Sequence, residues 1–125
     1  MQLHIDTVRR ILESSRGCKK YLDKEMFDKD CKKLPNPVCG IKYFSVFSDK
    51  NVIHYSGDPD SGDPGGFWDI SGDELKYHYD LLGAMGCFLH YSPEHSQGSH
   101  IPVQYLSWAG HDRLNELKKQ ANNPY

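Results

Sequence analysis

Histidines and aspartates are the residues of this chain whose types and spacing could do chemistry. His90, His95 and His100 surround one expected turn, and imidazoles gathered in this way can hold zinc or nickel. His54 could reach them through the fold. Spacings of five residues match no recognised ligand pattern, however. We therefore expect a solvated turn, with no metal and no other cofactor.

The aspartates resemble a calcium-binding loop only in part. Asp58, Asp60 and Asp69 occupy the first, third and last ligand positions of such a frame. Gly62 stands where another ligand belongs, and Asp63 stands where the frame needs its turn glycine. The final ligand is also a short Asp instead of a bidentate Glu. The pattern favours a flexible acidic loop.

No catalytic signature accompanies these residues. The sequence contains neither a nucleophile-elbow serine nor a glycine loop that could cradle phosphate at a helix start. His78 and His111 fall within expected helices, where a carbonyl or carboxylate commonly satisfies the ring. The cysteines follow no paired-ligand spacing and are expected to be reduced thiols, several of them buried: Cys18, Cys31, Cys39 and Cys87. We expect a non-enzymatic protein; a metal-dependent enzyme ranks a distant third.

Length and composition indicate one globular domain. The chain has 125 residues, of which 38% are hydrophobic and 12% aromatic, so a core can form and disorder is not expected. Apolar runs are too short for a membrane span. Charged residues interrupt the first 16 positions, so no secretory signal is expected there. These features favour a cytoplasmic protein.

Hydrophobic periodicity places the elements of the first half. Ile5, Val8, Ile11 and Leu12 recur at helical spacing and predict a helix over about 4–16. A second, short helix is expected within 18–33. Residues 41–47 and 52–55 predict a β-hairpin, because β-branched and aromatic residues flank a polar turn. An exposed loop and a short strand at 67–70 follow.

In the second half, a helix, two strands and a last helix are expected. Ser71 should cap a helix whose buried face is Leu75, Tyr79, Leu82 and Met85 and which ends at Gly86. Residues 87–91 and 101–106 should pair as a two-stranded wing. Ser107 should then cap a closing helix that buries Leu114, Leu117 and Ala121. We expect Trp108 to fill the core and Gly110 to permit close helix approach.

Three patches resemble an uncharacterised family of winged-helix proteins of phages, prophages and other bacterial mobile elements. They are Ile5–Leu12, Asp73–Leu82 with the following Gly86, and the closing motif Leu106-Ser-Trp-Ala-Gly-His-Asp-Arg-Leu114. The resemblance implies an α+β winged helix of phage-related origin and assigns His78, Ser107, Trp108, Gly110 and His111 to the structural motif. It implies no reaction. Residues 1–125 would form a single domain with an insertion at about 18–66.

The charge distribution favours a protein partner. Residues 34–100 carry three basic residues against nine acids, a balance that repels a polyanion and suits a basic protein surface. Our leading hypothesis is therefore an adaptor or inhibitor that binds host machinery through an acidic face. That face comprises Asp58, Asp60, Asp63, Asp69, Asp73, Glu74 and Asp80.

The alternative hypothesis is a DNA-binding transcriptional regulator. Residues 1–33 carry nine Lys or Arg against six acids, and a winged helix commonly docks one helix in the major groove. The nucleic-acid-binding residues would then be Arg9, Arg10, Arg16, Lys19, Lys20, Lys24, Lys76 and Tyr77. The sequence leaves the oligomeric state open and indicates no membrane partner.

Overall fold

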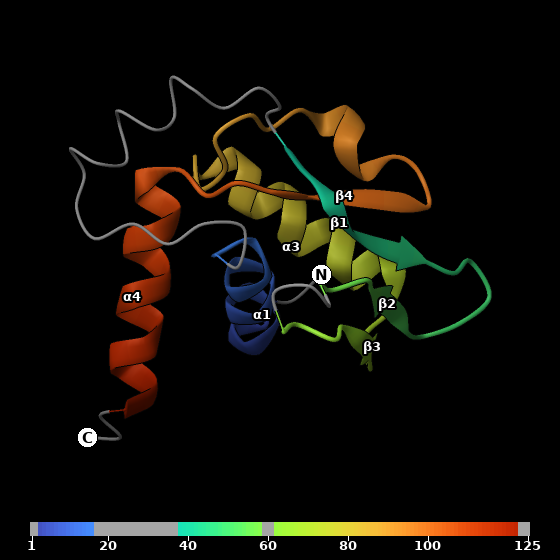
Figure 1. Cartoon of the computed structure of the whole chain (residues 1–125), viewed down its shortest axis with the longest axis horizontal. Helices are drawn as coiled ribbons and strands as arrows, with labels where there is room; N and C mark the ends of the chain where they lie inside the picture. The colour runs from blue at the N-terminus through green and yellow to red at the C-terminus, as the bar shows by residue number, and fades with distance from the viewer. Residues whose placement is uncertain (1–2, 17–37, 59–61, 123–125) are drawn as a thin grey trace.

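The protein has a mixed α+β fold, as the sequence predicts. It is described here from a computed structural model for residues 3–16, 38–58 and 62–122 (Figure 1). These residues form three α-helices, one short 3-10 helix and a four-stranded antiparallel sheet. In chain order the elements are α1 (Ile5–Arg16), β1 (Val38–Val46), β2 (Ile53–Tyr55), β3 (Gly66–Trp68), α3 (Gly72–Ala84), η2 (Pro93–Ser96), β4 (His100–Gln104) and α4 (Trp108–Asn122).

The sheet has the strand order β3-β2-β1-β4, so β1 is a central strand although it comes first in the chain. The hairpin predicted from the β-branched residues is confirmed, with Phe44 opposite Tyr55 and Val46 opposite Ile53. On its other side β1 pairs with β4 across a register shift between Cys39 and Tyr43. Between the pairs that these two residues form, β1 advances four positions while β4 advances one, so the ladder is interrupted there.

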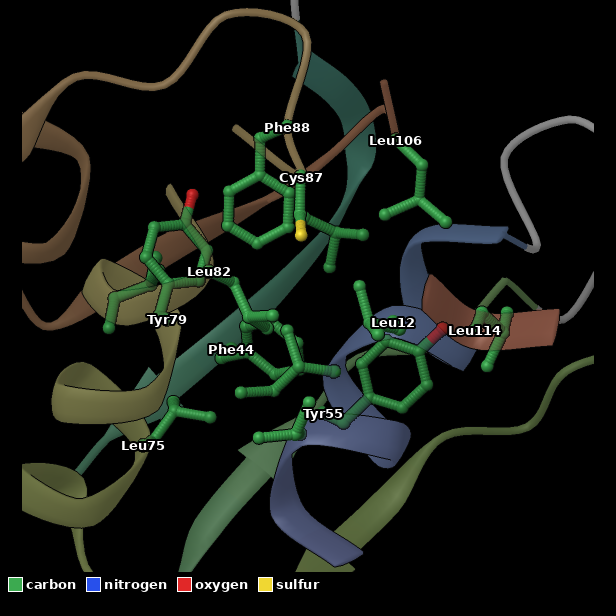
Figure 2. Close-up of a cluster of buried hydrophobic side chains, with 14 of the residues drawn as sticks. Leu12, Phe44, Tyr55, Leu75, Tyr79, Leu82, Cys87, Phe88, Leu106 and Leu114 are labelled. Carbon is green, nitrogen blue, oxygen red and sulfur yellow. The ribbon is translucent and has the colours of Figure 1, made fainter. Parts of the chain in front are cut away.

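One core fills the space between the sheet and the helices (Figure 2). The inner face of the sheet contributes Phe44, Tyr55 and Trp68, whose rings contact one another at centroid distances of 5.3 to 5.6 Å. The helices add apolar residues at three- and four-residue spacing, which gives each helix one buried stripe. These residues are Val8, Ile11 and Leu12 of α1, Leu75, Tyr79 and Leu82 of α3, and Leu114 and Leu117 of α4.

Both predicted caps of α3 are present. The hydroxyl of Ser71 accepts a hydrogen bond from the backbone N–H of Glu74 at 3.1 Å, which satisfies one free donor of the first turn. Gly86 follows the helix with φ of +77°, a left-handed conformation that residues with a side chain rarely adopt. The chain can therefore reverse direction immediately after α3.

The two-stranded wing is a wrong prediction. Residues 87–91 touch 101–106 through only one isolated bridge, between Phe88 and Leu106, and β4 pairs along β1 instead. The physical reason is burial: β1 gives β4 a partner across its whole length and lets Ile101 and Val103 enter the core. The segment between the expected strands contains η2, which begins at Pro93.

Three residues expected in the core lie at its edge. Ile5 is 48% exposed and Met85 is 46% exposed, because each lies at an end of its helix, beyond the neighbouring elements. Trp108 is only partly buried, and its ring lies beside that of His111 at 6.5 Å. The first residue of α4 therefore borders the core instead of filling it. The side chain of Ala121 lies outside the described residues.

The segment expected to be an insertion contributes to the centre of the sheet. Residues 18–66 include β1 and β2, and their Phe44, Ile53 and Tyr55 are buried core residues. The short helix expected within 18–33 lies outside the described residues. None of the described helices has the length and apolar character needed to cross a membrane.

Candidate functional site

Two of the predicted acidic-face residues are partly exposed and hydrogen-bonded to side chains of other elements. Asp80 is the first: its Oδ1 accepts hydrogen bonds from the Tyr91 hydroxyl at 2.8 Å and the Ser96 hydroxyl at 2.7 Å. Burial, followed by the hydrogen bond to Asp80 and its charge, raises the pKa of Tyr91 to about 12. Asp80 therefore links α3 to η2 and is only partly exposed, so its carboxylate is not the free outward-facing charge that the sequence predicts.

Asp63 is the second engaged acid. The Tyr55 hydroxyl donates to its Oδ2 at 2.5 Å, and the Lys42 ammonium lies 3.7 Å from the same oxygen. The Lys42 side chain is only 1% exposed, so its charge depends on a nearby anion for stabilisation. Asp63 and Asp58 also exchange two backbone hydrogen bonds. The loop expected to be unpacked is thus anchored to the sheet.

Glu74 belongs to a third structural cluster, with two histidines. Its Oε1 lies 3.2 Å from Nε2 of His4, and its backbone carbonyl lies 2.7 Å from Nδ1 of His78. Nε2 of His78 accepts the backbone N–H of His4 at 2.9 Å. Both ring nitrogens of the buried His78 are therefore satisfied, as predicted, and the ring links the start of α1 to α3.

The remaining acids of the predicted face have different surroundings. Asp69 and Asp73 are exposed on either side of the Ser71 cap, at the junction of β3 and α3. Asp58 is partly exposed, with its backbone in the bridge to Asp63. Asp60 lies outside the described residues. Within the described part of the chain, the predicted acids that are exposed therefore lie at the β3–α3 junction.

The predicted basic face is described only in part. Arg9 contacts Asp6 at 3.3 Å within α1, and the guanidinium of Arg10 lies 4.6 Å from the centroid of the Trp68 ring. Tyr77 is exposed on α3, with its ring edge-on to His78, and Lys76 is partly exposed. The side chain of Arg16 and the residues Lys19, Lys20 and Lys24 lie outside the described residues.

The closing motif is structural in the described fold. The Ser107 hydroxyl accepts the backbone N–H of Gly110 at 3.1 Å and thereby caps α4, as predicted. Gly110 packs against the backbone of Cys87: a Cβ at Gly110 would lie 2.2 Å from that carbonyl oxygen. The close approach is confirmed, although it joins α4 to a loop instead of a second helix. His111 is 9% exposed and belongs to the same interface.

The histidines considered as metal ligands have separate partners. His95 contacts Gln104 and the Ser92 backbone, while His100 lies against the ring of Tyr43. His54 lies against Phe67. Among residues 3–16, 38–58 and 62–122, no group of three metal-ligating side chains is present. Burial raises the pKa of the Cys87 thiol, which disfavours a reactive thiolate.

A cavity of about 350 Å³ lies where the β1–β2 turn meets the start of α3. Lys50, Lys76, Ser71, Asp73 and Ser99 are among its lining residues. Positive and negative side chains share its wall. The cavity therefore adjoins the exposed acids of the β3–α3 junction and brings two lysines close to them.

Sequence reasoning missed a surface formed by the sheet itself. The face opposite the core, which we call the outer face, carries Tyr43, Ser45, His54, Phe67 and His100. Phe67 is 69% exposed and Tyr43 is 40% exposed. Period-two alternation in 43–47 and 53–55 could have revealed it, since alternate residues of a strand point to opposite faces. The aromatic residues on both faces hid that alternation.

Comparison with known proteins identifies no relative of this chain. Neither protein-family models, nor curated proteins, nor solved structures yield a match to this chain.

Proposed function

We propose that this protein is a non-enzymatic adaptor or inhibitor that binds a basic surface of another protein. The observation that carries the proposal is the pair of exposed carboxylates, Asp69 and Asp73, at the β3–α3 junction, where Asp69 follows the exposed Phe67 of the outer face by two residues. Exposed apolar surface rimmed by polar residues is typical of protein interfaces. Acidic groups around it would steer and orient a partner of opposite charge.

Charge supports a protein partner over DNA. Residues 38–70 carry five Asp against two Lys, and one of these lysines, Lys42, is buried beside Asp63. A nucleic acid approaching the sheet would meet uncompensated carboxylates, and phosphate attraction supplies most non-specific affinity for DNA. A basic protein surface would be attracted by the same carboxylates.

The proposal includes a cytoplasmic, phage-related origin and host machinery as the target. Within it, α1, α3 and α4 would correspond to the helices of a winged-helix ancestor. β1 and β2 would then be an elaboration that fills the sheet. This relationship rests on the three sequence patches, of which α3 and the closing motif keep their expected caps.

The test is capture from a bacterial host lysate with tagged protein and a charge-reversed variant. Asp69→Lys combined with Asp73→Lys should reduce recovery of the partner at least tenfold. Asp112→Lys with Glu116→Lys makes the same charge change on exposed positions of α4 and should leave recovery unchanged. The competing hypothesis, a DNA-binding regulator, is tested by fluorescence anisotropy. This measures binding of random duplex DNA at increasing salt concentrations.

Two results contradict the proposal. One is an unchanged set of captured proteins with the β3–α3 variant. The other is tight DNA binding that falls steeply with salt concentration, which favours the transcriptional regulator. In that case Arg9 and Arg10 become the first positions for charge reversal.

A further inference from the structure

The outer face of the sheet carries one continuous row of side chains across all four strands. Phe67 of β3 pairs with His54 of β2, His54 pairs with Ser45 of β1, and Ser45 pairs with His100 of β4. Directly paired residues of antiparallel strands point to the same face. The four side chains therefore lie side by side on the face that the core does not use.

The row has aromatic rings at both ends and a small residue in the middle. On one side the rings of His54 and Phe67 lie 4.8 Å apart, tilted by 58°. On the other side the rings of Tyr43 and His100 lie 5.3 Å apart, tilted by 48°. Ser45 separates the two pairs. The side chain of Ser45 is the smallest in the row and is partly exposed.

These rings are exposed, in contrast to those on the inner face. Phe67 and Tyr43 face solvent, while their chain neighbours Trp68 and Phe44 are buried. A phenylalanine as exposed as Phe67 contributes little to the core, so its ring is available for contact with another molecule. Rings fixed on adjacent strands of a rigid sheet lose little freedom on binding, which favours recognition.

A cation–ring contact is already present just beyond the end of β1, beside the cavity at the start of α3. The ammonium of Lys50 lies 5.4 Å from the centroid of Phe47, the residue that follows β1. Aromatic faces attract cations through their quadrupole, and arginine does so most often. The excess of aspartate in residues 38–70 adds long-range attraction for positive charge. The exposed ring pairs and the excess of negative charge thus favour the same ligand chemistry.

We propose that the outer face binds an arginine side chain from an extended segment of the partner, with its guanidinium above Ser45 between the two aromatic pairs. A guanidinium is planar, weakly hydrated and able to stack, whereas an ammonium is compact and strongly hydrated. The Ser45 hydroxyl can accept one of its N–H groups. This inference rests on the proposed function and names the chemistry of its partner.

The test is an NMR titration of the ¹⁵N-labelled full chain with two short peptides. One is a seven-residue peptide of glycine and serine with two arginines separated by one glycine. The other replaces both arginines by lysine. We expect amide shifts at Tyr43, Ser45, His54 and Phe67, and a Kd at least threefold lower for the arginine peptide, since its advantage over lysine comes from stacking.

Two variants and one control assign the binding to the rings. Phe67→Ala should weaken the arginine peptide about threefold to fivefold, the range of one exposed cation–π contact. Phe67→Tyr keeps an aromatic face and should retain binding. Tyr77→Ala removes an aromatic ring of comparable exposure to Tyr43 from α3, outside the sheet, and should change nothing. A thermal melt of each variant verifies that the fold persists.

Several outcomes overturn the inference. Equal affinity for the lysine peptide would indicate charge attraction alone, and absence of shifts on the outer face would exclude the site. If a ten-nucleotide thymidine strand bound more tightly than the arginine peptide, the outer face would be a base-stacking surface for nucleic acid. Outer-face shifts that depend on protein concentration without peptide would identify a second copy as the occupant. If only the peptide fails while Asp69 and Asp73 remain necessary for capture, the adaptor function stands.

Discussion

Gly110 is a position where the absence of a side chain decides how two segments pack. The first turn of α4 lies against the backbone of Cys87, and the Ser107 backbone N–H donates to the Cys87 carbonyl at 2.9 Å. A carbonyl held in place by a hydrogen bond cannot move away from an added methyl group. The closing motif therefore needs glycine here for steric reasons.

Gly110→Ala should lower the free energy of unfolding by up to about 2 kcal/mol, because overpacking costs about 1–3 kcal/mol and the helix propensity of alanine offsets about 1 kcal/mol of it. Urea denaturation followed by circular dichroism measures the change. Gly98→Ala is the matched control, since a Cβ there meets nothing closer than 3.9 Å. Equal stability of the two variants would show that the Cys87 backbone can yield.

The connection between β2 and β3 illustrates how a loop can be fixed by charges. Asp63 receives the Tyr55 hydroxyl and lies beside the buried Lys42 ammonium, while its backbone pairs with Asp58. Removing the carboxylate would leave Lys42 without this anion. A buried charge that loses its partner costs more than the pair contributes when intact.

Asp63→Ala should destabilise the fold by about 2–3 kcal/mol, through the lost charged hydrogen bond and the isolated ammonium. In a Lys42→Met background the same substitution should cost at least about 1 kcal/mol less, because no buried charge remains. Urea denaturation of the four proteins of this double-mutant cycle gives the coupling energy. Asp69→Ala, which replaces an exposed aspartate, should change the free energy of unfolding by no more than about 0.5 kcal/mol. Additive effects in the cycle would refute the coupling.

At the level of elements, sequence periodicity predicted the helices better than the sheet. Val8, Ile11 and Leu12 identified the buried stripe of α1, and Ser71 with Gly86 marked the ends of α3, because these signals are local. The β1–β4 pairing joins residues about sixty positions apart, and no local pattern specifies it. The predicted wing paired 101–106 with its near neighbour in sequence for that reason.

The candidate site was predictable only in part. Asp69 and Asp73 were expected at the surface and are exposed there. Asp63 and Asp80 were expected beside them, but these carboxylates are partly exposed and accept hydrogen bonds from the hydroxyl groups of Tyr55, Tyr91 and Ser96. Sequence spacing cannot indicate such partners, since they come from other elements. The outer aromatic row likewise depends on the register between strands.

For the molecule as a whole, two tyrosines with raised pKa values contribute to the response to alkaline pH. The pKa of Tyr91 is raised to about 12, and burial also raises that of Tyr79. The folded protein therefore holds these protons more tightly than the unfolded chain, in which tyrosine titrates near pH 10. The resulting stabilisation is complete below about pH 10 and decreases as the pH rises from 10 towards 12.

Tyr91→Phe should be less stable than the native chain at pH 8 by about 1 kcal/mol, because the hydrogen bond to Asp80 is lost. Its stability should then fall less steeply between pH 10 and 12, since one of the perturbed phenols is gone. Urea midpoints measured at half-unit intervals of pH give both slopes. Parallel curves for the two proteins would contradict the assignment to Tyr91.

The position of β1 between β2 and β4 also has a consequence for biosynthesis. During translation β1 and β2 are synthesised early. However, β1 cannot pair with its second neighbour, β4, until residues 100–104 have emerged from the ribosome. During that interval β1 exposes unpaired backbone groups and apolar side chains such as Phe44. A chain in this state is prone to associate with other chains. A nascent chain of this protein should therefore attract chaperones until β4 arrives, and translation pauses placed between β2 and β4 should lengthen that dependence.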